Sequence, residues 1–265
     1  MSNSADTTSD PILVVRSVER RFGGLLAVSV DRLDVSRHTI TALIGPNGAG
    51  KTTLFNVLTG FDHADGGHWR FDGVDVSGWS AYRVARAGMV RTFQLTKALA
   101  GLTVLENMLL GASGQSGERM LIAPFRFRWR VEEQAARARA LALLDDFGLS
   151  ARRHDLAATL SGGQRKLLEM ARALMVEPKL VMLDEPMAGV NPALVQSLLH
   201  HVERLRDEGR TVVFVEHDMD VVMTIADRVV CMAEGRIIAD GTPDEVVSNQ
   251  AVIDAYLGQR HARTT

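Results

Sequence analysis

The stretch Gly45-Pro-Asn-Gly-Ala-Gly-Lys-Thr-Thr53 decides the fold of this chain. It satisfies the pattern G-x-x-x-x-G-K-[S/T], in which Gly45 and Gly50 are the two glycines. The short apolar run Thr39–Ile44 comes directly before it, and the helical pattern Lys51–Leu58 follows. A strand, a glycine-rich turn and a helix in this order predict a loop whose N–H groups converge at the start of the helix.

This loop has the chemistry of a phosphate-binding site. Glycines allow the tight turn, and the helix that begins near Lys51 adds the positive end of its dipole. The Lys51 ammonium can reach the β- and γ-phosphates, and the Thr52 hydroxyl can ligate Mg²⁺. A glycine-rich turn that matches by chance is the alternative, which the flanking pattern disfavours.

A pair of carboxylates follows a second apolar run, in Leu180-Val-Met-Leu-Asp-Glu-Pro186. The run predicts a central strand, and ligands of open α/β sheets bind beyond the carboxyl ends of such strands. Asp184 therefore suits a Mg²⁺ carboxylate, and Glu185, pointing the other way in the pleat, could polarise an attacking water. Two solvated acids at a strand end are the alternative.

Short apolar runs alternate with helical patterns along the whole chain, which predicts an α/β fold with a mostly parallel sheet. The further strands expected are Ile12–Val18, Thr211–Val215, Asp227–Met232 and Arg236–Ala239, the last two joined by the turn Glu234-Gly235. The further helices expected are Val131–Phe147, Gly163–Met175 and Pro192–Arg206. The stretch from about 95 to 176 has no clear strand, and we expect a helical subdomain inserted between sheet strands.

Composition excludes several classes of protein. The 265 residues carry 30 basic and 32 acidic side chains, a net charge of −2, which argues against a broad nucleic-acid surface. Cys231 is the sole cysteine, so an internal disulfide or a multi-cysteine metal site is impossible. Residues 1–11 lack the features of a signal peptide and are expected to be a disordered lead. No apolar run is long enough to cross a bilayer, so any membrane role is expected to be peripheral.

A second helix start lies at Leu160-Ser-Gly-Gly-Gln164. Ser161 is a suitable N-cap, and the two glycines leave backbone N–H groups uncovered. These features predict a second anion site, although an ordinary capped helix start has the same residues.

With this motif, the sequence resembles the ATP-binding-cassette ATPases over nearly its whole length. The motifs stand in the family's order: Gly45–Thr53, Gln94, Leu160–Gln164, Leu180–Glu185 and His217. The resemblance implies a P-loop NTPase core with a mostly parallel central sheet, an antiparallel β part and the inserted helical subdomain. It also implies a head-to-tail pair of subunits, in which each ATP is held between one subunit's phosphate loop and the other's signature, Leu160–Gln164, at the start of its helix.

The resemblance assigns roles to single residues. Gln94 matches the glutamine that touches Mg²⁺ and water, and His217 matches the histidine that contacts the γ-phosphate. Phe22 matches the aromatic residue that stacks on adenine, with core packing as the alternative. Lys51, Glu185 and His217 are the expected catalytic residues.

The expected binding residues form three sets. ATP is expected at Phe22 and at Gly45, Pro46, Asn47, Gly48, Ala49, Gly50, Lys51, Thr52 and Thr53. The partner's ATP is expected at Ser161, Gly162, Gly163 and Gln164. Mg²⁺ is expected at Thr52, Gln94 and Asp184. A single ATPase domain is expected over 12–257, with a tail at 258–265.

Within the family, three features resemble the ATPases of branched-chain and hydrophobic amino acid uptake systems. They are Phe22–Val28, Glu185–Pro192 and the ending that comprises Gly241–Val246 and Ala255–Gly258. This branch implies two transmembrane permease subunits, a second ATPase subunit (the same chain or a paralogue), an external substrate-binding protein, and a place on the cytoplasmic face of the membrane.

Two positions depart from the wider family. Asn191 stands where the family usually has an acid in Ser-Ala-Leu-Asp, and His38-Thr39 replaces a Gly-Glu turn. The segment Phe125–Arg130 alternates aromatic and basic residues, which is typical of a loop with packed rings or of a contact with a partner or lipid headgroups.

Three alternatives to amino acid import remain. The same engine could serve another transporter, such as a lipopolysaccharide exporter. A non-transport cassette ATPase needs a long coiled coil, a second cassette or a basic surface, and none of these is visible in the sequence. A kinase or GTPase would leave Ser161–Gln164 and His217 unexplained.

Overall fold

The computed structural model describes residues 10–92, 100–112 and 126–262, and it divides into two compact units. The first unit comprises residues up to Met89 with Lys179–Pro186 and Leu199 onward, and the second comprises Val90–Pro178 and Met187–Leu198. Among the described helices, none combines the length and the apolar character that a membrane span requires.

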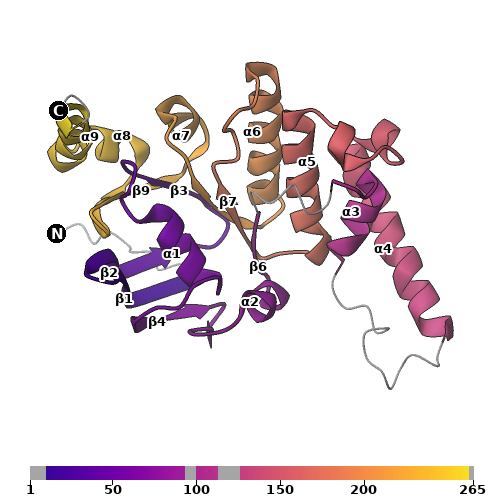
Figure 1. Ribbon diagram of the computed structural model, residues 1–265, viewed down its shortest axis with the longest axis horizontal. Coiled ribbons are helices and arrows are strands. Elements are labelled where there is room, and N and C mark those ends of the chain that lie inside the picture. The colour runs from indigo at the N-terminus through magenta and orange to yellow at the C-terminus, as the bar shows by residue number, and fades with distance from the viewer. Residues whose placement is uncertain (1–9, 93–99, 113–125, 263–265) are drawn as a thin grey trace, which may run out of the picture. The chain divides into compact units, whose positions relative to one another are not determined.

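The first unit contains two sheets (Figure 1). A four-stranded antiparallel sheet has the order β2-β1-β4-β5. A six-stranded sheet has the order β10-β9-β3-β8-β7-β6; its pairs β3·β8, β3·β9 and β7·β8 are parallel, and β9·β10 is antiparallel. The strands are β1 (Leu13–Phe22), β2 (Leu25–Val35), β3 (Ile40–Ile44), β4 (Gly66–Phe71), β5 (Val74–Asp75), β6 (Met89–Arg91), β7 (Leu180–Asp184), β8 (Thr211–Val215), β9 (Arg228–Ala233) and β10 (Arg236–Gly241).

The central parallel strands are apolar because both of their faces are covered. Every residue of β3, β7 and β8 is buried, as short uncharged runs predict for strands between two layers of structure. Strand β1 instead alternates buried and partly exposed residues along its first half, as expected of a sheet with one covered face. The predicted α/β fold with a mostly parallel central sheet is confirmed.

Helix α1 (Lys51–Leu58) begins at the residue that the sequence predicts. Its side chains Leu54, Phe55 and Leu58 are buried in one apolar cluster with residues of both sheets, and the helix lies between β3 and the antiparallel strands (Figure 1). The core therefore fixes the helix directly behind the phosphate loop, so the loop's position follows from packing.

The first unit contains further helices. They are α2 (Ala81–Ala87), α7 (Met219–Ile225), α8 (Pro243–Val247) and α9 (Gln250–Ala262), and α6 (Pro192–Asp207) begins in the second unit and ends in the first.

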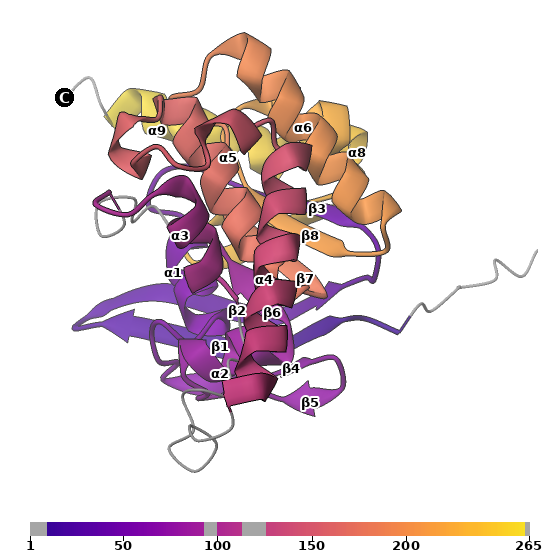
Figure 2. The ribbon, with the colours of Figure 1, turned by 90° about the vertical axis from the view of Figure 1, so that its right-hand side faces the viewer.

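Within the described residues, the second unit is mostly helical, and it also holds the last two residues of β6. Helix α4 (Arg126–Asp146) packs beside α3 (Val104–Leu110) and α5 (Gly162–Ala173), as Figure 2 shows. Helix α4 starts five residues earlier than predicted, so the loop interpretation of Phe125–Arg130 is wrong for residues 126–130, which form the first turn of this helix. The alternation of aromatic and basic residues, which has no helical period, is the reason that the sequence favours a loop there.

The His38 turn accommodates a side chain where the family usually has glycine. His38 has φ = 58°, in the left-handed region that disfavours a Cβ. Its amide donates to Thr211 Oγ1 at 2.9 Å, and its Nδ1 contacts the Gly209 carbonyl oxygen. These two contacts hold the unusual conformation and tie the start of β3 to the start of β8.

Phe55→Ala tests the packing of α1. Phe55 is 1% exposed, so truncation should lower the free energy of unfolding by about 3 to 5 kcal/mol, measured by urea denaturation. Phe61→Ala is the matched control because Phe61 follows the same helix and is 49% exposed, and its cost should be below about 1 kcal/mol. Equal costs for the two variants would contradict the assigned core.

Candidate nucleotide-binding site

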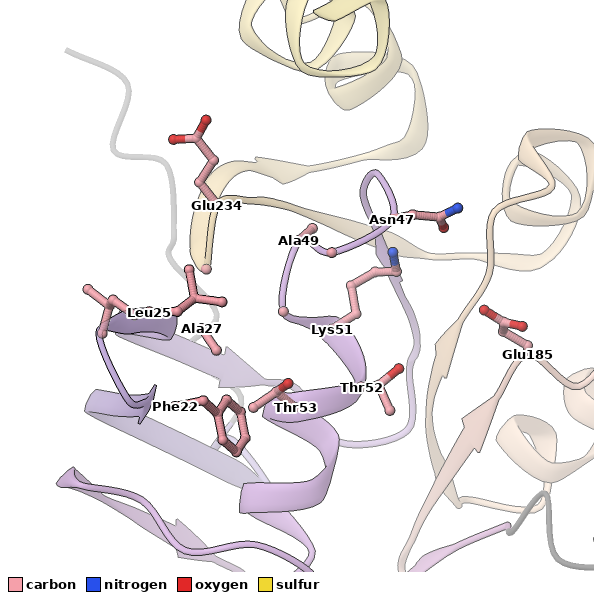
Figure 3. A pocket seen from close by; sticks show the side chains of 14 residues that line it. Phe22, Leu25, Ala27, Asn47, Ala49, Lys51, Thr52, Thr53, Glu185 and Glu234 are labelled. Carbon is pink, nitrogen blue, oxygen red and sulfur yellow. The ribbon is translucent and has the colours of Figure 1, made fainter. Parts of the chain in front are cut away.

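A pocket of about 650 Å³ opens at the phosphate loop of the first unit. Figure 3 shows Phe22 and Leu25 on one side of the loop, Glu185 on the other, and the Lys51 and Thr52 side chains between them. The lining residues are Phe22, Leu25, Leu26, Ala27, Asn47, Gly48, Ala49, Gly50, Lys51, Thr52, Thr53, Glu185, Glu234 and Gly235. The pocket thus combines apolar side chains, the Lys51 cation with the backbone of its loop, and the carboxylates of Glu185 and Glu234.

Two backbone carbonyls explain why the loop needs its glycines. A Cβ on Gly45 would lie 2.0 Å from the Met232 oxygen, and a Cβ on Gly50 would lie 2.4 Å from the Ala27 oxygen. Both glycines also have positive φ, 143° and 97°. Residues with side chains would displace the loop at both positions, so the turn depends on close backbone approach.

The Ala27 carbonyl reaches the loop because β2 is irregular at this point. Arg20 pairs with Val28 and Arg21 pairs with Leu26, which leaves Ala27 as an extra residue in β2. The turn between β9 and β10 completes the support, since the Gly235 amide donates to the Ala49 carbonyl at 3.0 Å. Strands of two sheets therefore hold the loop.

The Lys51 ammonium is held by its own loop. Its Nζ donates to the carbonyl oxygens of Gly45 at 2.6 Å and Pro46 at 3.0 Å. Burial lowers the pKa of this lysine below its ordinary value, and the nearby Glu185 carboxylate opposes that shift. The loop thus keeps a cation at its centre, beside amides that can accept an anion.

The acidic pair stands at the carboxyl end of β7, as predicted. Asp184 is the last residue of the strand and is buried, whereas Glu185 lies in the left-handed region with φ = 46°. Glu185 therefore lies in a turn beyond the pleat of β7, and this turn directs its side chain into the pocket, which Asp184 does not line. Such a strained non-glycine conformation is common at functional sites.

His217 follows β8, which pairs with β7. Asp184 lies opposite Val215 in the register, and the Glu185 amide donates to the Val215 carbonyl at 3.1 Å, so the two strand ends are adjacent. His217 itself is exposed and does not line the pocket, and Asp184 does not line it either. Gln94 lies outside the described residues.

Phe22 is the last residue of β1 and precedes the two-residue hairpin loop Gly23-Gly24. Its side chain is 48% exposed and lines the pocket, so the alternative of core packing is wrong. An exposed aromatic face beside a phosphate-type loop can stack on a planar base.

Cys231 lies directly behind the loop, opposite Ile44 in the register of β9 and β3. The thiol is fully buried, and burial raises its pKa to about 11. It therefore stays neutral beneath the Lys51 cation.

The signature residues belong to the second unit. Ser161 caps α5, as predicted, and the cap is reciprocal: Ser161 Oγ accepts from the Gln164 amide at 3.2 Å, and Gln164 Oε1 accepts from the Ser161 amide at 3.0 Å. Gly162 is exposed, but Gly163 is buried, and a Cβ there would lie 1.9 Å from Leu194 Cδ2. The two positions thus require glycine for different reasons: Gly162 leaves the helix start exposed, and Gly163 allows close packing.

Asn191, which departs from the family's usual acid, caps α6. Its Oδ1 accepts a hydrogen bond from the Leu194 amide at 3.0 Å, a role that an asparagine or an aspartate oxygen can fill equally.

The pattern of the ABC transporter family matches this chain over residues 29–188, which hold the phosphate loop, the signature and the acidic pair. This chain belongs to the ABC transporter family. The family hydrolyses ATP to power transport. Residues 236–262 also match the pattern of the branched-chain amino acid ATP-binding cassette transporter.

Curated relatives and solved structures agree with this assignment. The chain is 42% identical over 253 residues to the high-affinity branched-chain amino acid transport ATP-binding protein BraF of Pseudomonas aeruginosa, covering 95% of this chain and 99% of that protein. It is 40% identical to the probable branched-chain amino acid transport ATP-binding protein LivG of Archaeoglobus fulgidus, covering 93% and 95%. The ADP conformation of an ATP-binding cassette of an ABC transporter superposes with a TM-score of 0.82 at 37% identity, covering 94% and 99%.

The sequence did not single out Leu25, Leu26, Ala27, Glu234 or Gly235 as pocket residues. Two signals could have found them: the Gly23-Gly24 hairpin, which places β2 beside Phe22, and the Glu234-Gly235 turn, which needs a glycine at φ = 80°. Both signals mark tight turns, but neither says which loop the turn approaches.

Gly45→Ala tests the carbonyl constraint on the loop. The added Cβ meets the Met232 backbone, so the free energy of unfolding should fall by about 3 to 4 kcal/mol in urea denaturation. Gly48→Ala is the control because Gly48 also has positive φ, but no described atom outside its immediate neighbours lies within 4 Å of the position that a Cβ would take. It should cost only about 1 to 2 kcal/mol, the backbone part. A smaller loss of unfolding free energy for Gly45→Ala than for Gly48→Ala would show that the Met232 backbone does not constrain the loop at Gly45.

Proposed function

We propose that this chain is the ATP-binding and ATP-hydrolysing subunit of an importer for branched-chain or other hydrophobic amino acids. The observation that carries the ATPase part is the pocket that brings Lys51, the backbone of the phosphate loop and Glu185 together. The substrate class rests on the relatives, which are named as branched-chain amino acid transport ATP-binding proteins, and on the match over residues 236–262.

The pocket orients ATP from one end to the other. Adenine stacks on Phe22 at the apolar end, and the triphosphate lies across the amides from Asn47 to Thr53 at the start of α1. Lys51 exchanges its contacts with the Gly45 and Pro46 carbonyls for the β- and γ-phosphates. This exchange replaces one set of hydrogen bonds to the cation with another, so the buried ammonium is never left without acceptors.

Glu185 is the group that acts on water. Its carboxylate lies at the pocket end away from Phe22 (Figure 3), where the γ-phosphate of an ATP in this orientation would stand. A carboxylate there orients a water for in-line attack and accepts its proton. His217, at the end of the adjacent strand β8, contacts the γ-phosphate once the nucleotide is bound.

The chain's own residues fit Mg²⁺ as a companion of ATP. Within the described ranges no group of three or more His, Cys, Asp or Glu side chains could form a protein cage for a metal. Mg²⁺ suits such a site because it keeps several waters and binds through one or two protein oxygens together with substrate phosphates. Thr52 and Asp184 would supply those oxygens, with Gln94 as the further ligand, and the ion would neutralise charge on the phosphates.

Two copies of the cassette complete the site. The exposed start of α5, with its Ser161 cap and the open Gly162, offers backbone amides to the ATP of a second ATPase subunit, the same chain or a paralogue. Two permease subunits and an external binding protein complete the transporter, which places this chain at the cytoplasmic face of the membrane through those partners. The ATPase subunit of a transporter for another substrate remains the second candidate function, because the transported substrate is recognised by the other chains.

Glu185→Gln tests the catalytic assignment. Glutamine keeps the size but cannot accept the proton, so turnover should fall by about 100-fold to 10,000-fold while the dissociation constant for ATP stays within about threefold. Because hydrolysis lets the head-to-tail pair of subunits separate, the variant should accumulate as a dimer with ATP but not with ADP. Size-exclusion chromatography with light scattering measures this, with the paralogue added if needed. An ATPase rate near wild type would reject Glu185.

Glu234→Gln is the matched control for that variant. Glu234 also lines the pocket but lies in the β9–β10 turn, so the same chemical change there should leave the ATPase rate within about threefold. In cells that lack the native gene, the wild type and Glu234→Gln should restore uptake of radiolabelled leucine, and Glu185→Gln should not. An active ATPase that restores no leucine uptake with its permeases present would reject the substrate class alone.

Ser161→Arg tests the shared site. The arginine removes the reciprocal cap with Gln164 and fills the exposed helix start, so hydrolysis should fall at least about tenfold. ATP binding by a single subunit, measured by isothermal titration with isolated monomer, should be unchanged. Loss of monomer binding instead would place Ser161 in its own subunit's site.

A further inference from the structure

The exposed Phe22 ring is covered on one face by a guanidinium. Arg20 Cζ lies 4.6 Å from the centre of the Phe22 ring, within the range of a cation–π contact. The two residues are two positions apart on β1, so they project from the same face of the strand. The extra residue at the register shift, Ala27, belongs to β2, so the alternation along β1 is kept.

Two carboxylates fix this guanidinium. Arg20 Nε donates to Asp62 Oδ2 at 2.9 Å and Arg20 Nη2 lies 2.8 Å from Asp62 Oδ1, a two-pronged pair. Arg20 Nη1 lies 3.3 Å from Asp65 Oδ1. A planar group held at three points cannot rotate freely, so the ring that it covers has a fixed backing.

Asp62 and Asp65 are themselves held by hydrogen bonds with the backbone of α1 and β1. The Asp62 amide donates to the Asn56 carbonyl at 3.1 Å, which joins it to α1. The Asp65 amide donates to the Glu19 carbonyl at 2.8 Å, and Asp65 Oδ2 accepts from the Arg21 amide at 2.6 Å. The segment that leaves the phosphate-loop helix is thereby connected to the strand that carries Phe22.

We propose that Arg20 is a positioning residue for the purine base: held by Asp62 and Asp65, it clamps the rear face of Phe22 and presents the other face for stacking. This inference rests on the proposed ATP binding at Phe22. An exposed phenyl ring without backing has several rotamers, and a ligand that stacks on it must first immobilise it, which weakens binding. Arg20 does this in the free protein.

The role predicts an effect that depends on the base. Arg20→Met keeps a long apolar stem but removes the planar cation, so the dissociation constants for Mg·ATP and Mg·ADP should rise about threefold to tenfold. Binding of Mg·tripolyphosphate, which has no base, should change less than about twofold. The KM for ATP should rise with the same factor while kcat at saturation stays within about twofold. Arg20→Lys should weaken ATP binding as Arg20→Met does, because an ammonium can neither stack as a plane nor hold two carboxylates in this way.

Two further variants separate clamping from general effects. Arg32→Met is the matched control: Arg32 pairs with Asp34 at 2.7 Å on the neighbouring strand β2 and does not stack on Phe22, so its ATP binding should equal wild type. Phe22→Ala should weaken ATP binding, and Arg20→Met added to it should cause no further loss if the two residues act as one unit.

Each result decides a different claim. Equal weakening of ATP and tripolyphosphate by Arg20→Met would overturn the clamp in favour of a charge effect, and so would additive losses in the double variant. Weaker binding with Phe22→Ala but unchanged binding with Arg20→Met would reject Arg20 alone. Unchanged binding with Phe22→Ala would reject both roles while ATP binding stands. A wild-type chain that binds no Mg·ATP would reject the proposed function itself.

Discussion

Close approach of two backbone carbonyls to the phosphate loop is the constraint on which the site depends. The Ala27 oxygen stands against Gly50 and the Met232 oxygen against Gly45, and neither leaves room for a Cβ. These carbonyls come from β2 and β9, strands of the two different sheets. The loop is therefore shaped by backbone rather than by side-chain rotamers, and its amides are oriented before any anion arrives. Preorganised dipoles of this kind need no rearrangement when charge appears.

The ends of two neighbouring strands set the positions of the polar side chains next to that loop. The fully buried strands β7 and β8 lie in register, so their carboxyl ends bring Glu185 and the segment before His217 to neighbouring positions. Lys51 stands between this acidic end and the aromatic end at Phe22 (Figure 3). A nucleotide has the same order of properties along its length, from apolar base to anionic phosphate to the bond that water attacks. In the proposed function, the pocket therefore sets the orientation of ATP as well as its position.

Much of this could be predicted from sequence because it is local. The run before Gly45, the helix from Lys51 and the Ser161 cap follow from short-range preferences, and the structure agrees with each. What sequence could not give depends on residues far apart in the chain. The extra residue Ala27 in β2 matters only because the loop lies behind it, and the turn at Glu185 has no glycine to announce its positive φ. The aromatic–basic alternation after residue 125 favoured a loop, yet helix propensity over the next 20 residues prevails.

The burial of Cys231 makes the native chain ready for site-directed labelling. It is the sole thiol in the sequence, it is fully buried beneath the loop, and its pKa is raised to about 11, so little thiolate exists at neutral pH. Maleimide and other thiol-directed reagents should therefore leave the folded protein unmodified. A cysteine introduced at an exposed position such as Tyr82 would be the single attachment point for a fluorophore or spin label. The signal of that label could then be followed as nucleotide is added, without first removing the natural cysteine.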